Sequence, residues 1–118
     1  MDSKVVDYTI QMDVHAGKMD EFQAIAARAT AETLERDPGC LMYEWSVFGD
    51  SVQLHERFSD EAAWMAHIDW AEPTFGELLA LSTLASFDIH ATDLGPATTA
   101  KAAEFGAKIY APTGGFAR

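Results

Sequence analysis

The stretch PGCLMYEWSVFGDSVQLHERFSDEAAWMAHI, residues 38–68, decides the fold because it holds a β-hairpin and the start of the next helix. Gly49-Asp50 separates two runs in which apolar and polar residues alternate, and such a two-residue loop is typical of the tight turns that join antiparallel strands. The turn sets the register of the hairpin. One face pairs Val47 with Val52, Trp45 with Leu54, Tyr43 with Glu56 and Leu41 with Phe58, and the other pairs Glu44 with His55, Ser46 with Gln53 and Met42 with Arg57.

Glu56 is the one charged residue on the apolar face of this hairpin. A carboxylate in such a place raises its pKa or finds a hydrogen-bond partner, and both outcomes are common at functional sites. Tyr43, directly across the hairpin, is a candidate partner. The alternative is that Glu56 lies near a sheet edge and reaches water or a helix N-terminus.

Trp64 and His67 lie three residues apart in the helix after the hairpin, so they occupy neighbouring positions on one helix face. We expect this face to turn toward the sheet. His67 can exchange a proton near neutral pH or orient a hydroxyl group of a ligand, although a histidine on a helix is more often a structural residue. Trp64 is either plain core or the wall of a pocket.

Regular patterns precede and follow the hairpin. Alternation over residues 5–14 predicts a strand, and apolar residues at helical spacing predict a helix over residues 18–36. A second helix is expected over residues 59–70, with Ser59 as its N-cap. Pro73 is expected to open a further short helix. Alternation over residues 85–94 predicts a fourth strand.

This βαββαβ order predicts an α+β, ferredoxin-like fold, in which helices pack on one face of an antiparallel sheet. We expect a single domain over residues 1–118, with its core at about 5–94 and a C-terminal extension at about 95–118. Pro96 and Gly106 enclose a helix in the extension, and the KIYAP sequence that follows predicts a short strand. The extension either covers an edge of the sheet or reaches across a dimer.

The sheet face without helices carries a mixed surface, too apolar for full exposure and too polar for a core. Its expected members are Thr9, Gln11, Met42, Ser46, Phe48, Gln53, His55 and His90. A second copy of the sheet would cover it, so we expect a symmetric homodimer through this face. His55 and His90 are expected there as interface residues, paired with Glu44 or Asp88.

Composition narrows the classes of function. The net charge of −11, with only 8 Lys and Arg residues, argues against binding to nucleic acid or to anionic membrane surfaces. The single cysteine, Cys40, excludes an internal disulfide framework and is a weak candidate for a nucleophile. No apolar stretch approaches the length of a membrane span, and the first ten residues lack the regions of a signal peptide. We expect a soluble, cytoplasmic protein.

Several features in order suggest a family. Gly17-Lys18 opens the first helix, Pro38-Gly39-Cys40-Leu41 precedes Tyr43-Glu44, Glu56 lies near the end of the third strand, and Ala66-His67 lies in the second helix. This combination resembles the antibiotic biosynthesis monooxygenase family, the quinol monooxygenase-like group of dimeric α/β barrels, over roughly residues 5–94.

The resemblance implies a small homodimer with an apolar pocket between sheet and helices in each subunit. Members oxidise aromatic phenols or quinols with molecular oxygen, without metal, flavin or haem. An electron-rich phenol that has lost its proton can pass an electron to oxygen itself, so the protein need only bind the ring, stabilise the phenolate and exclude water. On this basis Glu56, His67 and Tyr43 are the expected catalytic residues. The expected substrate-binding residues are Tyr8, Trp45, Trp64, Phe75 and Phe87.

Other chemistries fit this chain less well. Haem-degrading relatives use an Asn and a later His, and this chain has Thr9 or Ile10 and Gly76 near those places. Relatives that act on a phosphorylated sugar would need basic residues near the pocket, where only Arg28 and Arg57 are available and Arg57 is expected to face away. No metal-ligand spacing, nucleophile elbow or phosphate-binding loop is present.

Two classes of function therefore remain. The first is a cofactor-independent monooxygenase that oxidises a small aromatic phenol, quinol or polyketide-like substrate. The second is a non-catalytic dimeric module of the same fold, which binds a small apolar ligand or serves in a stress response. The sequence does not name the substrate.

Overall fold

The structure is a computed structural model that describes residues 4–118; residues 1–3, which the sequence places in the same domain, lie outside the described residues. Its elements follow the order β1 (Val6–Val14), α1 (Met19–Arg36), β2 (Cys40–Phe48), β3 (Ser51–Phe58), α2 (Glu61–Leu79), β4 (Ser82–His90), α3 (Pro96–Glu104) and β5 (Lys108–Tyr110). This confirms the predicted α+β, ferredoxin-like arrangement with a C-terminal helix and strand.

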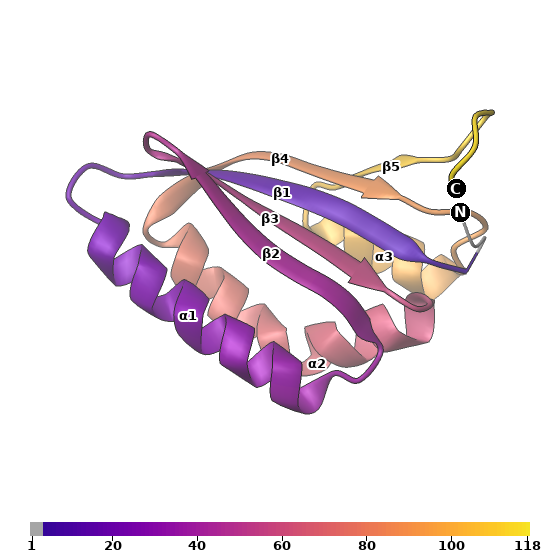
Figure 1. Cartoon of the computed structure of the whole chain (residues 1–118), viewed down its shortest axis with the longest axis horizontal. Helices are drawn as coiled ribbons and strands as arrows, with labels where there is room; N and C mark the ends of the chain where they lie inside the picture. Colours follow the sequence, from indigo (N-terminus) through magenta and orange to yellow (C-terminus); the bar gives the residue numbers. More distant parts are fainter. Residues whose placement is uncertain (1–3) are drawn as a thin grey trace.

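One five-stranded sheet has the order β2-β3-β1-β4-β5. Its first four strands pair antiparallel, and β5 adds to the edge of β4 in parallel. Figure 1 shows all three helices on the same side of the sheet, which leaves the other face without helices. The extension thus covers one sheet edge, the first of the two paths that the sequence left open.

Alternation in β1 sends one set of its side chains into the core between sheet and helices. Val6, Tyr8, Ile10, Met12 and Val14 are all buried, as the sequence predicts. The same layer includes buried residues of three other elements: Phe22 and Ala26 of α1, Trp64 and Ile68 of α2, and Phe87 and Ile89 of β4. The core therefore lies along the face of the central strand that the helices cover.

The hairpin register is confirmed from Val47 opposite Val52 to Met42 opposite Arg57, but the expected pair of Leu41 with Phe58 is wrong. The register shifts between Cys40 and Met42, so that Cys40 lies opposite Phe58. An extra residue in one strand forms a β-bulge, and here it turns Leu41 out to solvent.

Helix α2 departs most from its prediction. It begins after Asp60, whose side chain accepts a hydrogen bond from the Ala63 backbone N–H, so Asp60 and not Ser59 is the cap. It also continues through Pro73 to Leu79 as one helix. A proline inside a helix costs about 3 kcal/mol, and buried residues on both sides of it, such as Ile68 and Leu78, offset this cost by packing in the same core.

Two smaller expectations also need correction. Strand β4 runs over Ser82–His90, earlier than the expected 85–94, because it pairs along β1 as far as Val14 and because Asp93, with a φ of 54°, turns the chain. On the open face, His55 lies opposite Glu44 but bonds to Asp7 at 2.9 Å. His90 stacks on the Tyr110 ring and is not paired with Asp88.

Candidate functional site

Glu56 lies between two tyrosines on neighbouring strands. In the sheet register it is opposite Tyr8 of β1 on one side and Tyr43 of β2 on the other. Only 2% of Glu56 is exposed, so the alternative in which it reaches water at a sheet edge is wrong. Three polar side chains thus form a row across the sheet, on the face that the helices cover.

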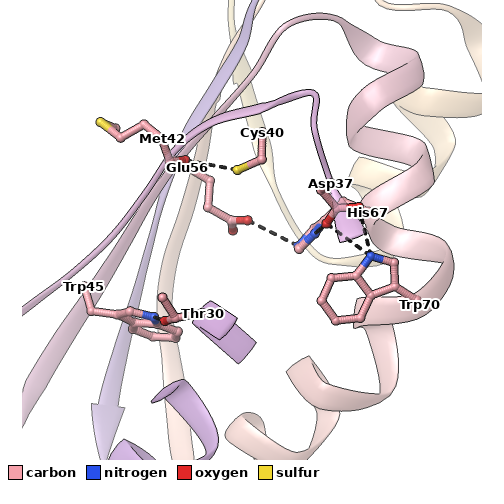
Figure 2. Close-up of polar contacts among 8 residues, drawn as sticks. All are labelled: Thr30, Asp37, Cys40, Met42, Trp45, Glu56, His67 and Trp70. Atoms are coloured by element: carbon pink, nitrogen blue, oxygen red, sulfur yellow. Dashed lines mark hydrogen bonds and ion pairs between the residues drawn. The ribbon is translucent and has the colours of Figure 1, made fainter. Parts of the chain in front are cut away.

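His67 of α2 and Asp37 complete this group. The His67 Nδ1 atom lies 2.6 Å from Asp37 Oδ2, and its Nε2 atom lies 3.3 Å from Glu56 Oε1. Figure 2 shows the imidazole between the two carboxyl groups, with the Trp70 indole on the far side of Asp37. Trp70 Nε1 donates to both oxygens of Asp37, at 3.0 and 3.1 Å.

The end of α1 positions Asp37. Asp37 is the C-cap residue of this helix, its backbone N–H donates to the Thr33 carbonyl, and its own carbonyl accepts from the Cys40 N–H. Gly39 lets this turn approach α2 closely, because a Cβ atom at residue 39 would lie 2.5 Å from the Ala63 Cβ. The tight turn therefore brings the carboxylate to the side of α2 that carries His67.

Burial sets the protonation of the group. The pKa of Glu56 is raised to about 8, mainly by desolvation; a hydrogen bond with Tyr8 lowers it and the nearby Asp37 charge raises it. Desolvation lowers the pKa of His67, while the hydrogen bond and charge of Asp37 oppose this shift. Near pH 7 Glu56 is thus a neutral acid and His67 a neutral base. The hydrogen bond to Asp37 places the remaining imidazole proton on Nδ1, so Nε2, on the side of Glu56, is unprotonated.

The two tyrosines stay protonated. Desolvation, followed by the charge of Glu56, raises the pKa of both Tyr8 and Tyr43 well above the ordinary value. Their hydroxyl groups are therefore hydrogen-bond donors and not bases. A ligand oxygen in this region meets O–H donors on the sheet side and one nitrogen base on the helix side.

A pocket opens between the sheet and the helices at this group. It holds about 530 Å³ of empty space, including its mouth. The wall is mostly apolar, and its polar side chains include Thr33, Tyr43, Glu56, His67, Glu72 and Thr74. A largely apolar cavity with a few converging polar groups is the usual form of a small-molecule site.

Two polar atoms of the pocket wall lack a partner. Glu56 Oε1 and Thr33 Oγ1 are the buried side-chain oxygen or nitrogen atoms, among residues 4–118, that make no hydrogen bond of good geometry. Oε1 is within ion-pair distance of His67 Nε2, but the two are not aligned as donor and acceptor. An unpaired buried polar atom costs about 1–3 kcal/mol, so a bound polar ligand that pairs with these oxygens gains affinity.

The pocket gathers most of the residues that the sequence singled out. Glu56, His67 and Tyr43 line it together with four of the five expected substrate-binding residues, Tyr8, Trp64, Phe75 and Phe87. Trp45 does not line it. Its indole N–H donates instead to Thr30 Oγ1 of α1 at 3.0 Å, as Figure 2 shows.

Tyr43 is not the expected partner of Glu56. No hydrogen bond joins the two side chains in the described part of the chain, and the Tyr43 hydroxyl is instead close enough to Thr33 for that contact to lower its pKa. Cys40 is half-buried, its thiol donates to the Met42 carbonyl, and desolvation raises its pKa to about 11, which is unfavourable for a nucleophile.

The sequence did not predict four residues that line or support the pocket: Asp37, Trp70, Thr33 and Phe105. In the sequence, Asp37 stands at a helix end before Pro38-Gly39, and Trp70 is an aromatic residue three positions after His67. Neither feature by itself predicts a site residue. Phe105 lies in the extension, whose path the sequence left open. Each of these residues reaches the site through tertiary packing.

Other kinds of site find no support within residues 4–118. No cluster of three or more His, Cys, Asp or Glu side chains is placed to hold a metal ion. None of the helices described there is long and apolar enough to cross a membrane.

One family of known proteins matches the chain. The family model for antibiotic biosynthesis monooxygenase matches residues 8–71 of the chain. No curated protein matches the sequence.

Solved structures show the same fold at low sequence identity. MupZ from Pseudomonas fluorescens is 18% identical, with a TM-score of 0.82 over 98% of this chain and 95% of MupZ. A mutant of SnoaB from Streptomyces nogalater, a cofactor-independent oxygenase, is 20% identical, with a TM-score of 0.64 over 79% of this chain and 97% of SnoaB. A conserved protein from Methanosarcina mazei Go1 is 18% identical, with a TM-score of 0.68 over 77% of this chain and 95% of that protein.

Proposed function

The chain belongs to the antibiotic biosynthesis monooxygenase family, and from this premise we propose that it oxygenates a small aromatic phenol or quinol with molecular oxygen, without metal, flavin or haem. One observation carries the proposal: a neutral base, a neutral acid and two unpaired oxygens converge on one end of an otherwise apolar, aromatic pocket. SnoaB, a cofactor-independent oxygenase of the same fold, supports the reaction class.

In the proposed reaction His67 Nε2 removes a proton from the bound phenol. Asp37, hydrogen-bonded to Nδ1, stabilises the imidazolium that forms. The protonated Glu56 and the Tyr43 hydroxyl donate hydrogen bonds to the phenolate oxygen. The apolar walls exclude water from the electron-rich ring.

The electrons come from the substrate. The phenolate gives one electron to O₂, and the resulting superoxide and substrate radical combine to a peroxide on a ring carbon. When that carbon carries a hydrogen, as in an anthrone, loss of water leaves a carbonyl. One oxygen atom of O₂ enters the product and the other leaves as water, so a CH₂ group becomes C=O and no external reductant is consumed.

Oxygen uptake tests this function. With a panel of hydroquinones and anthrones the parent protein should consume O₂, and ¹⁸O₂ should place one labelled atom in the product. His67→Ala and Glu56→Gln should each lower kcat at least tenfold, about 1.4 kcal/mol in the barrier. His90→Ala is the matched control, because His90 stacks on Tyr110 outside the pocket wall. The proposal fails if no substrate raises oxygen uptake above background, or if both variants match the parent.

A second candidate uses the same pair without oxygen. The pKa values of Glu56 and His67 are displaced in opposite directions, and a neutral acid facing a neutral base is the arrangement of enzymes that move protons in isomerisation or cyclisation. Product formation under anaerobic conditions would favour this candidate. Tight binding with no turnover under either condition would favour the non-catalytic module.

We also infer a homodimer through the open sheet face. Helices cover only one face of the sheet, and the other presents the half-buried Thr9 and Gln11 beside the charged cluster of Asp7, His55 and Arg57. A second copy would cover this mixed surface by two-fold symmetry.

A further inference from the structure

Helix α3 is fixed to α2 at two places. At its N-terminal end, the Glu61 carboxylate accepts from the Gly95 backbone N–H at 3.2 Å and from the Thr98 hydroxyl at 2.6 Å. Toward its C-terminal end, Lys101 Nζ lies 2.6 Å from Glu72 Oε1. Glu72 itself belongs to the pocket wall, so the second contact lies beside the pocket.

Phe105, directly after α3, is therefore carried into the pocket wall. Its ring stacks on Phe87 with centroids 5.9 Å apart and planes 13° apart, and it meets Phe75 edge-on at 5.7 Å. Lys101 lies over the outer side of the same ring, 5.6 Å from its centroid. The three phenylalanines form an aromatic group contributed by α2, β4 and the extension.

Tyr8 separates this aromatic group from the polar end of the pocket. It lies opposite Glu56 in the sheet and its ring is 5.1 Å from that of Phe87. A ligand whose hydroxyl meets Glu56 and His67 thus extends past Tyr8 toward Phe87 and Phe105. No Lys or Arg lines the pocket within the described residues, and the Asp37 carboxylate lies beside its wall, so an anionic ligand is disfavoured.

Solved structures of this fold cover different shares of the chain. The solved structures of SnoaB and of the Methanosarcina mazei protein cover 79% and 77% of the chain, whereas MupZ covers 98%. The difference is about one fifth of the chain, which is the length of residues 95–118.

We propose that Phe105, held in place by α3, selects uncharged fused-ring phenols over single-ring phenols by packing against the ring farthest from the hydroxyl group. The inference rests on the proposed function for the aromatic nature of the ligand, but it concerns binding alone. An aromatic pair contributes about 0.5–1.5 kcal/mol beyond its buried area, which corresponds to a factor of about 2 to 13 in Kd.

The test is an anaerobic titration with phenol, 2-naphthol and 2-hydroxyanthracene, followed by the quenching of tryptophan fluorescence, since Trp64 and Trp70 line the pocket. Without oxygen the proposed oxygenation cannot occur. The parent should bind more tightly with each added ring. Phe105→Leu, which keeps an apolar side chain, should weaken 2-hydroxyanthracene about tenfold and phenol less than about twofold. Phe116→Leu is the control, because Phe116 lies in the same tail but is 82% exposed.

A second variant tests the attachment of α3. Lys101→Met removes the ion pairs with Glu72 and Glu104 and the cation over the Phe105 ring while keeping an apolar stem. It should weaken the three-ring ligand about two- to fivefold, even if Phe105→Leu does not fold. The inference is overturned if the parent shows no preference for larger rings, if Phe105→Leu weakens all three ligands equally, or if neither variant differs from Phe116→Leu. Failure of the proposed function would give a different result. Binding would still depend on the number of rings, but the protein would take up no oxygen in air.

Discussion

Asp37 acts on both titrating residues of the pocket, so its replacement gives the sharpest test at the scale of one residue. Asp37→Asn keeps an oxygen that can accept from His67 Nδ1 but removes the charge. Since that charge raises the pKa values of both His67 and Glu56, both should fall. The pH profile of kcat/KM needs His67 neutral and Glu56 protonated, so both of its limbs should move to lower pH, with a loss of at least about tenfold at the optimum.

The matched control is Asp60→Asn, because Asp60 caps α2 at an exposed position and asparagine is an equally good cap. Its profile should coincide with that of the parent. A purely structural Asp37 would instead give a smaller rate with both limbs of the profile unmoved, and that outcome would rule out the positioning role.

Glu56 gives a second prediction, on stability. Its pKa is raised from 4.5 to about 8 in the folded protein, so folding favours the protonated form. The contribution of Glu56 to the free energy of unfolding is fully present below pH 4.5. It falls by roughly 3 to 5 kcal/mol as the pH rises through about 8. Glu56→Gln carries no charge and should exceed the parent in free energy of unfolding at pH 8.5 by more than it does at pH 5.5.

Urea unfolding at the two pH values measures this difference, with Glu44→Gln as control because Glu44 lies on the exposed face of the adjacent strand. His67, whose lowered pKa makes the folded state less stable below pH 6.5, is common to all three proteins and cancels in the comparison. An equal difference between Glu56→Gln and the parent at both pH values would mean that Glu56 is ionised in the folded protein.

At the scale of elements, the contact between the start of β2 and helix α2 determines where Asp37 lies. Gly39→Ala would place a Cβ atom 2.5 Å from the Ala63 Cβ, so the two elements must separate. We expect a loss of about 1–3 kcal/mol in the free energy of unfolding and lower activity, as the Asp37 to His67 distance grows.

Two further variants isolate this contact. Gly114→Ala should be neutral, since nothing lies within 4 Å of an added Cβ there. Ala63→Gly in the Gly39→Ala background should restore activity, although glycine in a helix itself costs about 1 kcal/mol. A double variant as inactive as the single one would show that the steric contact is not the cause.

The sequence predicts elements whose pattern is local. Alternation over residues 5–14 and the Gly49-Asp50 turn identify the buried face of β1 and the hairpin register, because the period of a strand and the geometry of a tight turn depend on neighbouring residues. The helix through Pro73 and the bulge at Leu41 depend on packing between distant elements. Local rules predict a break at Pro73, and only the core on both sides of it maintains the helix.

The residues of the candidate site also divide into those that a local pattern identifies and those that depend on packing between distant elements. Glu56 and His67 stand out because a charged residue on an apolar strand face and a histidine on a buried helix face break a local pattern. Asp37 lies 30 residues from His67, and nothing in the pattern joins them. Trp45 shares the face of Tyr43 but lies further along the strand, where Thr30 accepts its indole N–H. Register identifies the face of a residue but not which helix residue lies over it.

At the scale of the whole molecule, the unequal faces of the sheet bear on assembly. One face is sealed by three helices, while Thr9 at the centre of the other is only half-buried, in a single chain, between His55 and Asp88. If two copies meet through this face, the protein should sediment at about twice 12.9 kDa at micromolar concentration. Thr9→Lys should raise the dimer dissociation constant at least tenfold, about 1.4 kcal/mol, because it would place a charged side chain in the interface.

Thr9→Lys should weaken the dimer without unfolding the single chain. Asp88 lies opposite residue 9, so a lysine there has a partner within the single chain and the fold should be retained, as circular dichroism can verify. Thr99→Lys, on the exposed side of α3 in the helix layer, adds the same charge away from the open face and should leave the dimer intact. A parent that sediments at 12.9 kDa at all concentrations would rule out the dimer, and equal dissociation by both variants would place the interface elsewhere. Since residues of a single chain line the pocket on the helix-covered face, oxygen uptake by a monomeric Thr9→Lys protein should then match that of the parent.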